Sequence, residues 1–292
     1  MTGKGRPAGL FVGRSTLDIV YACFRFPEPD GKVDAEAAYL SGGGPALNGA
    51  VAFAGLGGQA RLCSMIGRGP MAERVRQDLG AHGVALVDTA EDQDGVLPVS
   101  TVILTGASRA IVNQPLPERA AELGPGPLDR LFEPRPDIVL SDGHLPDLAQ
   151  PILRRGREAG VPTVLDGGSW KPWTAELLPW IDIAIVSSRF RPPAAGGVSD
   201  PLELLSRSIG AVAITQGPKP IRWAQRGASG QIAPPKVRAI DTLGAGDIFH
   251  GAFCHAFAVS RDFPGSLEAA AAVASRSTES WGPRRWMTAG RG

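Results

Sequence analysis

The sequence predicts an α/β protein in which helices cover both faces of a mostly parallel sheet. Short apolar runs alternate with helical segments from residue 138 onward, the order of elements that produces a parallel sheet between two helical layers. The 38 glycines and 26 prolines are spread along the 292 residues, which indicates many tight turns. Hydrophobic residues make up 43% of the chain, enough for a sizeable core.

The first half of the chain mixes strands and helices less regularly. Apolar runs there predict strands, and a small-residue segment after Pro45 and an amphipathic segment at 71–82 predict helices. The expected strands are 10–12, 19–24, 35–41, 61–66, 83–87, 98–104 and 110–112. Two β-rich regions, about 19–41 and 98–113, break the alternation. We expect them to form a small separate sheet.

The second half follows the alternation closely. A short helix is expected in the proline-rich stretch between 115 and 136. The strands expected after it are 138–141, 163–166, 181–187 and 211–215, and the helices are 148–159, 201–209, a segment after 246, and 266–280. With no linker or internal repeat, residues 1–292 are expected to form one domain that carries the small sheet as an insertion.

Charge and cysteine usage exclude several classes of protein. The chain has 30 lysines and arginines against 29 acidic residues, without the basic excess of a nucleic-acid or anionic-membrane binder. Its three distant cysteines form neither a disulfide framework nor a zinc spacing, so a reducing cytoplasm is expected. No apolar stretch approaches the roughly 18 residues of a membrane span.

The most informative stretch is DTLGAGDIFHGAF at 241–253. Its glycines permit a tight turn into a helix, and the first backbone N–H groups of a helix attract anions. Asp247 would stand at the mouth of such a site. A carboxylate is badly placed to bind an anion, but well placed to take a proton from a nucleophile that attacks one. The alternative is that Asp247 has no catalytic role and is simply an aspartate at the start of a helix.

This stretch resembles the carboxy-terminal signature of the PfkB, or ribokinase-like, carbohydrate kinases, Asp-Thr-x-Gly-Ala-Gly-Asp-x-Phe-x-Gly-Ala, at every fixed position. The resemblance extends along most of the chain. Matching features are Gly13 and Asp18, the pair Gly43 and Gly44 with Asn48, the β-rich insertions where the family carries a lid, Thr215 and Gly217, and the alanine-rich helix around 271–277.

The resemblance implies a three-layer α/β/α sandwich of the ribokinase-like fold, with a small β lid. It implies a sugar kinase that uses ATP and Mg²⁺, with Asp247 as general base and the backbone of 244–246 as anion hole. The implied sugar-binding residues are Asp18, Gly43, Gly44 and Asn48, and the implied nucleotide-binding residues are Thr215, Gly217, Thr242, Gly244 and Gly246. Arg109, between the lid strands, is a candidate for an anionic group of the substrate or, equally, a solvated charge.

Three departures from the family pattern bear on metal and substrate. Residues 187–191 carry no acid where the family commonly has Asn-x-x-Glu, so no protein ligand for the metal is predicted. Residues 66–70 also lack an acid, and Pro45-Ala46-Leu47 replace the usual residues between the glycine pair and Asn48. Ribose preference is therefore not supported. The stretch 166–171 and His250 resemble a branch that acts on ketohexoses and modified fructoses.

Two other functions remain open from the sequence. A nucleoside kinase of the same superfamily would need an apolar slot for the base, and a catalytically weak, sugar-binding regulatory protein would explain the missing acid. We expect no nucleic-acid or membrane partner. The lid sheet is expected to pair with a second copy in a homodimer.

Overall fold

Two sheets organise the part of the chain that the computed structural model describes, residues 5–106, 108–116, 123–194 and 199–288. In these residues the large sheet has nine strands, in the order β13-β12-β11-β10-β9-β8-β1-β4-β5. They are β1 (Ala8–Val12), β4 (Gln59–Ser64), β5 (Val84–Asp88), β8 (Ile138–Ser141), β9 (Thr163–Gly167), β10 (Ile183–Ser187), β11 (Ala211–Gln216), β12 (Lys219–Gln225) and β13 (Ala228–Ile232). Pairing is parallel from β5 to β11 and antiparallel from β11 to β13.

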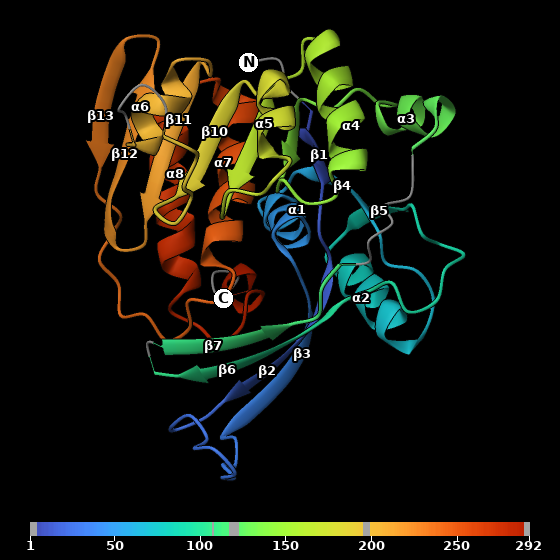
Figure 1. Ribbon diagram of the computed structural model, residues 1–292, viewed down its shortest axis with the longest axis vertical. Coiled ribbons are helices and arrows are strands. Elements are labelled where there is room, and N and C mark those ends of the chain that lie inside the picture. Colours follow the sequence, from blue (N-terminus) through green and yellow to red (C-terminus); the bar gives the residue numbers. More distant parts are fainter. Residues whose placement is uncertain (1–4, 107, 117–122, 195–198, 289–292) are drawn as a thin grey trace.

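Helices cover both faces of this sheet, as the alternation predicts (Figure 1). One layer contains α1 (Pro45–Gly55), α2 (Pro70–Ala81), α7 (Ala245–Ser260) and α8 (Phe263–Ser277). The other contains α3 (Pro125–Leu131), α4 (Pro146–Glu158), α5 (Thr174–Leu177) and α6 (Pro201–Ser206). Short 3₁₀ turns follow at η1 (Leu178–Trp180) and η2 (Arg285–Met287). This is the three-layer α/β/α sandwich that the sequence predicts.

The central strands are apolar because both of their faces are covered. All four residues of β8 and the first four of β10 are buried, as expected for strands of a parallel sheet between two layers of helices. The helices α1 and α7 approach each other closely at Gly251, where a Cβ would lie 2.2 Å from the carbonyl oxygen of Gly49. This approach explains the small residues of α1 and brings the amino ends of the two helices together.

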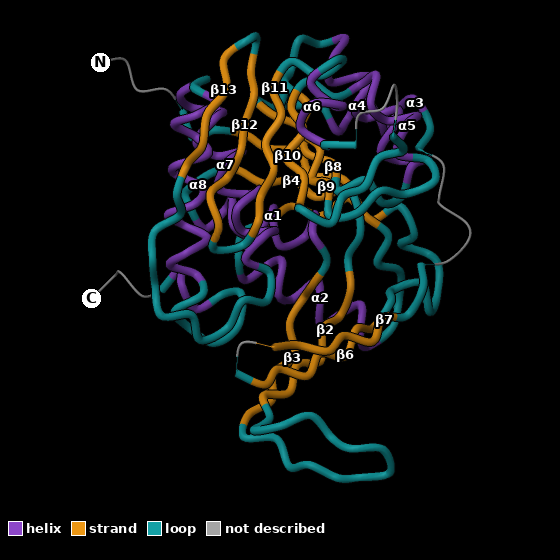
Figure 2. Tube along the Cα trace, turned by 60° about the vertical axis from the view of Figure 1, so that its left-hand side comes forward, coloured by secondary structure: helices purple, strands orange, loops and turns teal. Residues whose placement is uncertain are grey.

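The small sheet has the order β3-β2-β6-β7 and projects from the large one (Figure 2). Its strands are β2 (Thr16–Ala22), β3 (Ala37–Gly43), β6 (Val99–Thr105) and β7 (Ser108–Asn113). Its inner face buries Val20, Val102 and Leu104 against Leu243 and Trp281. The small sheet therefore rests on the signature turn and on the segment that follows α8.

The predicted elements agree with the structure in type, and most differ by a few residues at their ends. The predicted helix at 201–209 ends at Ser206, and the predicted helix at 266–280 runs from Phe263 to Ser277. The hairpin β12–β13 was not predicted, because polar residues interrupt both strands, which therefore lack the apolar run of a fully buried strand. None of the described helices combines the length and apolar character needed to cross a bilayer.

Candidate active site

The signature turn forms the amino end of α7, as predicted. Gly244 is the N-cap residue with φ of 73°, a left-handed conformation that glycine adopts without strain. The first helical hydrogen bond runs from Ile248 N–H to Gly244 C=O at 2.8 Å, and Ala245 N–H reaches the Thr242 carbonyl at 3.3 Å. The amides of Gly246 and Asp247 lie in the first turn, where helix N–H groups have no intrahelical acceptor. They can bind an anion there.

Asp247 stands in this first turn and contacts Asn48 at the amino end of α1. Nδ2 of Asn48 donates a hydrogen bond to Oδ2 of Asp247 at 2.8 Å. Burial, together with the negative charge of Asp166, raises the pKa of Asp247 from 3.8 to about 7, although the Asn48 hydrogen bond opposes the shift. A carboxyl group with a pKa near neutrality is suited to general base catalysis.

Asp18 lies on β2 at the junction between the two sheets. Burial raises the pKa of Asp18 above its ordinary value, although the Thr16 hydroxyl, which donates to Oδ1 at 2.6 Å, opposes the shift. The glycine pair is explained by close approaches. A Cβ at Gly43 would lie 2.1 Å from Oδ2 of Asp18, and one at Gly44 would lie 2.3 Å from the Arg14 carbonyl oxygen. Glycine at 43 thus makes room for the Asp18 carboxylate.

Arg109 is placed at the signature turn, at the rim of this group. Its Nη1 donates to the carbonyl oxygen of Thr242 at 3.2 Å and contacts its hydroxyl at 3.3 Å. The side chain is exposed. Arg109 therefore joins β7 of the small sheet to the loop that precedes α7, and it contacts none of the carboxylates described above.

Thr215 and Gly217 lie apart from the Asp247 group. Thr215 ends the parallel part of β11, where its carbonyl accepts from Ser188 N–H at 2.9 Å. Gly217, with φ of 61°, makes the turn into β12. Among the described residues, no hydrogen bond or ion pair joins either of them to Asn48 or Asp247. They share the carboxyl edge of the sheet with Asp247, as strand ends of one parallel sheet do.

A residue that the sequence did not single out completes the group. Arg284 donates from Nη1 to Oδ1 of Asn48 at 2.9 Å and from Nη2 to Oδ2 of Asp78 at 3.0 Å. Although burial opposes ionisation, the hydrogen bonds from His82 and Arg284 hold the pKa of Asp78 at about 2. No local sequence signal marks Arg284, because its partner Asn48 is 236 positions away.

A second buried pair lies beneath the first turn of α7. Oδ2 of Asp166 is 3.3 Å from Nδ1 of His250. Burial and the charge of Asp142 raise the pKa of Asp166 well above its ordinary value, and burial lowers the pKa of His250. The imidazole nitrogens also contact the carbonyl oxygens of Gly246 at 2.7 Å and Ile185 at 3.1 Å. His250, itself part of the signature stretch, is therefore tied to Asp166 on β9 as well as to the first turn of its own helix, and the sequence did not show the contact with Asp166.

Asp241, the first residue of the signature, holds the turn to its surroundings. Its Oδ1 accepts from Leu243 N–H at 2.8 Å, and its Oδ2 accepts from Gly282 N–H at 2.9 Å and from the Tyr39 hydroxyl at 3.2 Å. Tyr39 belongs to β3 and Gly282 follows α8. One buried carboxylate thus joins the signature turn, the small sheet and the segment that carries Arg284.

The stretch without an acid at 187–191 folds as a turn bound to its neighbours. Oγ of Ser187 donates to the Gly168 carbonyl at 2.7 Å and accepts from Arg189 N–H at 3.1 Å. Within the described ranges, no group of three or more His, Cys, Asp or Glu side chains is arranged to hold a metal ion. The donor set therefore fits a metal that arrives bound to phosphate oxygens and water.

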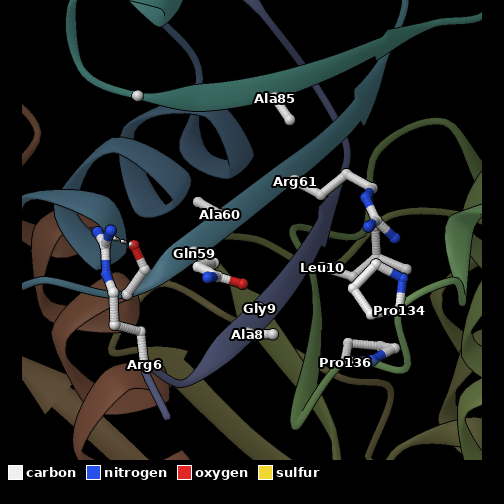
Figure 3. Close-up of a pocket in the computed structure, with 12 residues that line it drawn as sticks. Arg6, Ala8, Gly9, Leu10, Gln59, Ala60, Arg61, Ala85, Pro134 and Pro136 are labelled. Carbon is white, nitrogen blue, oxygen red and sulfur yellow. Dashed lines mark hydrogen bonds between the residues drawn. The ribbon is translucent and has the colours of Figure 1, made fainter.

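A cavity of about 280 Å³ lies at the opposite edge of the sheet from Asp247. Figure 3 shows Arg6, Leu10, Arg61 and Pro134 around it, at the amino-terminal half of β1 and along β4. The guanidinium of Arg6 is bound to the Gly57 carbonyl at 2.7 Å, and that of Arg61 to the Glu133 carbonyl at 3.0 Å. Ligands of open α/β sheets bind at the carboxyl ends of the strands, so this cavity is not the candidate active site.

Comparisons with known proteins point to one family. A family model described as pfkB family carbohydrate kinase matches residues 10–125 and 199–288. An ATP-dependent ribose-1-phosphate kinase of Halopiger xanaduensis is 28% identical over 288 residues, covering 96% of this chain and 95% of that protein. A ribokinase of Staphylococcus aureus is 27% identical over 272 residues, covering 87% of each. The structure of Arabidopsis thaliana ribokinase with ribose and ATP matches with a TM-score of 0.76 at 22% identity, covering 96% of this chain and 94% of that one.

Proposed function

The chain belongs to the pfkB family of carbohydrate kinases, and from this premise we propose that it transfers the γ-phosphoryl group of ATP to a primary hydroxyl group of a sugar. The single observation that carries the proposal is the position of Asp247. Its carboxylate shares the first turn of α7 with the free amides of that helix and is held by Asn48 at 2.8 Å. A base thus stands beside an anion site.

The transfer follows from these positions. The sugar hydroxyl attacks the γ-phosphorus of ATP, its proton passes to the Asp247 carboxylate, and the bond to the β-phosphate oxygen breaks to release ADP. Negative charge on the migrating phosphoryl group faces the amino end of α7, where the amides of Gly244 and Gly246 and the helix dipole stabilise it. The amide of Ala245, the third member of the expected anion hole, is bound to the Thr242 carbonyl at 3.3 Å. Little else is needed, because phosphoryl transfer depends mainly on positioning and charge stabilisation.

We propose that the sugar lies between Asp18 and Asp247, against Gly43, Gly44 and Asn48. Seven buried polar side-chain atoms have no hydrogen-bond partner among the described residues, although two of them face an ion-pair partner: Oδ2 of Asp166 faces His250, and Nδ1 of His144 faces Asp142. Two of the others lie beside Asp18: Nε of Arg14, and Oγ of Ser41, which is paired with Asp18 in the small sheet. Unpaired buried donors and acceptors are costly unless a ligand satisfies them. A polyhydroxylated ligand does so with hydroxyl groups that both donate and accept.

On the nucleotide side we propose that Thr215, Gly217 and Thr242 contact ATP together with Gly244 and Gly246. Relatives of this chain are named as ATP-dependent or were solved with ATP, and Mg²⁺ is the usual metal of such kinases. When bound with ATP, Mg²⁺ would neutralise negative charge on the phosphate oxygens. Its remaining ligands here would be water, because residues 187–191 supply no carboxylate.

The more specific part of the proposal concerns which sugar is the substrate. The sequence favours a fructose-like ketohexose on the strength of 166–171 and His250, and the structure ties Asp166 and His250 together beneath the signature turn. The curated relatives, in contrast, are named for ribose and ribose 1-phosphate. Both classes present a primary hydroxyl group, so pentoses form the second candidate. Arg109, exposed at the rim, is the proposed contact for an anionic sugar substituent.

An ADP-release assay over a panel of acceptors tests this function. The panel contains ribose, deoxyribose, ribose 1-phosphate, fructose, tagatose and adenosine, each with Mg²⁺ and ATP. We expect acceptor-dependent turnover at about 1–100 per second with at least one sugar. The matched control is the same sugar with its primary hydroxyl replaced by hydrogen, which should release no ADP. Turnover with adenosine alone would establish a nucleoside kinase instead, and no turnover with any acceptor would overturn the proposal.

We further propose that the small sheet mediates a homodimer. Its outer face exposes Tyr21, Leu40 and Val112, apolar side chains of the kind that marks an interaction surface. Ile19 and Leu40 are cross-strand neighbours on this face. Sedimentation analysis of Leu40→Glu against the wild type tests the interface, and an unchanged mass would contradict it.

The three cysteines support a reducing location such as the cytoplasm. Cys23, Cys63 and Cys254 are free and buried, as expected of thiols that remain reduced.

A further inference from the structure

Arg284 connects the carboxy-terminal segment to three elements around the candidate base. Its Nη1 donates to Oδ1 of Asn48 on α1, and its Nη2 donates to Oδ2 of Asp78 on α2 and to the Gly42 carbonyl on β3, at distances of 2.9, 3.0 and 2.9 Å. The side chain is 14% exposed. Such a fork of planar donors is a property of arginine that lysine does not share.

The contact with Arg284 determines how the amide of Asn48 is turned. With the carbonyl oxygen toward the guanidinium, the NH₂ group faces Oδ2 of Asp247 at 2.8 Å. The reversed amide would place N–H donors against the cation and a carbonyl oxygen against the carboxylate. Both contacts would be repulsive. Arg284 therefore selects the one orientation of Asn48 that donates to the base.

The segment that carries Arg284 is itself firmly held. Trp286 is buried against Ala52 and Ile248, and its Nε1–H donates to the Pro283 carbonyl at 3.0 Å. On the other side of Arg284, Gly282 N–H is bound to Asp241 of the signature at 2.9 Å. Arg284 thus projects from a fixed backbone, a condition for positioning another residue accurately.

We propose that Arg284 is a positioning residue for phosphoryl transfer, which acts on Asp247 by orienting the amide of Asn48. Arg284 does not touch Asp247 or the proposed path of the phosphoryl group. The proposal rests on the proposed function only in taking Asp247 as the base. The competing interpretation is that the ion pair between Arg284 and Asp78 merely anchors the chain end, in which case Asn48 would be irrelevant to the effect of losing Arg284.

A double-mutant cycle separates these two roles. The variants are Arg284→Met, Asn48→Ala and the combination, with Arg285→Met as the matched control, because Arg285 is the adjacent arginine and is exposed. Misplacement of a catalytic group costs up to about 100-fold in rate. We expect Arg284→Met to lower kcat to that extent while KM for ATP stays unchanged. In the Asn48→Ala background the same substitution should have no further effect on kcat. Multiplicative losses would overturn the proposal.

The pH profile supplies a readout that a chain-end anchor would not move. The Asn48 hydrogen bond favours the ionised carboxylate of Asp247, so its loss raises the pKa of Asp247. The acidic limb of kcat/KM should therefore move to higher pH in Arg284→Met and Asn48→Ala, and stay in place in Arg285→Met. The other charged groups that face Asp247 are unchanged in these variants: Asp166 on β9, His250 on α7 and Asp18 on β2. An unmoved limb would contradict the proposal.

Arg284→Lys covers the case in which Arg284→Met fails to fold because it leaves Asp78 unpaired. Lysine keeps a positive charge beside Asp78 but lacks the two-nitrogen fork that also reaches Asn48. We expect Arg284→Lys to keep the wild-type melting temperature and still show the lower kcat and the displaced limb. Asp247→Asn distinguishes the two levels of inference. If that variant keeps wild-type turnover, the proposed base is wrong; if it loses turnover while the cycle is multiplicative, only the role of Arg284 is wrong.

Discussion

Nδ2 of Asn48 lies 2.8 Å from Oδ2 of Asp247, although the two residues are 199 positions apart. The contact joins the amino ends of α1 and α7, two helices that approach closely where Gly251 meets Gly49. It favours the ionised form of the carboxylate, whereas burial and Asp166 favour the protonated form. The pKa of Asp247 near 7 is the balance of these opposing effects.

This balance predicts a pH-dependent enzyme. Asp247 acts as a base only when ionised, so kcat/KM should fall as the pH drops through about 7. A profile from pH 5.5 to 9 with a saturating Mg²⁺–ATP concentration measures the limb. A flat profile across this range would show that no group of this pKa controls the reaction. The profile of Arg285→Met serves as the control, because Arg285 is exposed and has no proposed role in the site.

Asp247 should also reduce the stability of the unliganded protein at neutral pH. Its folded-state pKa lies above the ordinary value of 3.8, so the folded protein binds this proton more tightly than the unfolded chain does. The resulting loss of stability grows as the pH rises from about 4 to 7 and is complete above 7. Asp247→Asn removes the ionisation. Its melting temperature should therefore exceed that of the wild type at pH 8, by more than at pH 5. A pH-independent difference would contradict this.

Asp166→Asn tests the electrostatic part of the account. The charge of Asp166 raises the pKa of Asp247, so its neutralisation should move the acidic limb of kcat/KM to lower pH. Asn fills nearly the same volume and keeps a hydrogen-bonding group beside His250, which lies 3.3 Å from Asp166. A limb that stays in place would mean that Asp166 does not act on the base in the working enzyme.

The close approach of Gly43 to Asp18 predicts a defect in sugar binding. A methyl group at 43 would lie 2.1 Å from Oδ2 of Asp18, so Gly43→Ala must displace the carboxylate. We expect a higher KM for the sugar and an unchanged KM for ATP in initial-rate measurements. Gly80→Ala is the control, because a Cβ added at position 80 would have no neighbouring atom within 4 Å. Ala at a helical position there is neutral or stabilises by about 0.5–1 kcal/mol. Equal KM values in Gly43→Ala and wild type would contradict a role for Asp18.

Much of this architecture could be predicted from local sequence. Parallel strands buried on both faces leave continuous apolar runs, so β8 was predicted with its observed bounds. The hairpin β12–β13 was missed, because polar residues interrupt both strands and leave no such run. Helix ends such as Ser206 depend on where the chain must turn toward the next strand, which local sequence does not determine.

In the candidate site too, local features could be predicted from the sequence and contacts between distant residues could not. The turn of the signature into a helix is a local structure, and the sequence predicted it; the structure adds that Gly244 is the N-cap residue. The contacts of Arg284 with Asn48 and Asp78 bridge more than 200 positions, and a Pro-Arg-Arg-Trp segment carries no motif that announces them. The burial that raises the pKa of Asp166 arises only when α7 covers β9. Contacts between residues that only packing brings together can be identified only from the structure.

The turnover of Asp247→Asn tests the central claim most directly. General base catalysis by a positioned side chain contributes about 100- to 10,000-fold, and Asn preserves the shape of Asp247 without its ability to accept the proton. With the best sugar of the panel, we predict that kcat falls by that range while the sugar and ATP still bind with wild-type affinity by calorimetry. Turnover within a few-fold of the wild type would contradict the assignment of Asp247 as the base.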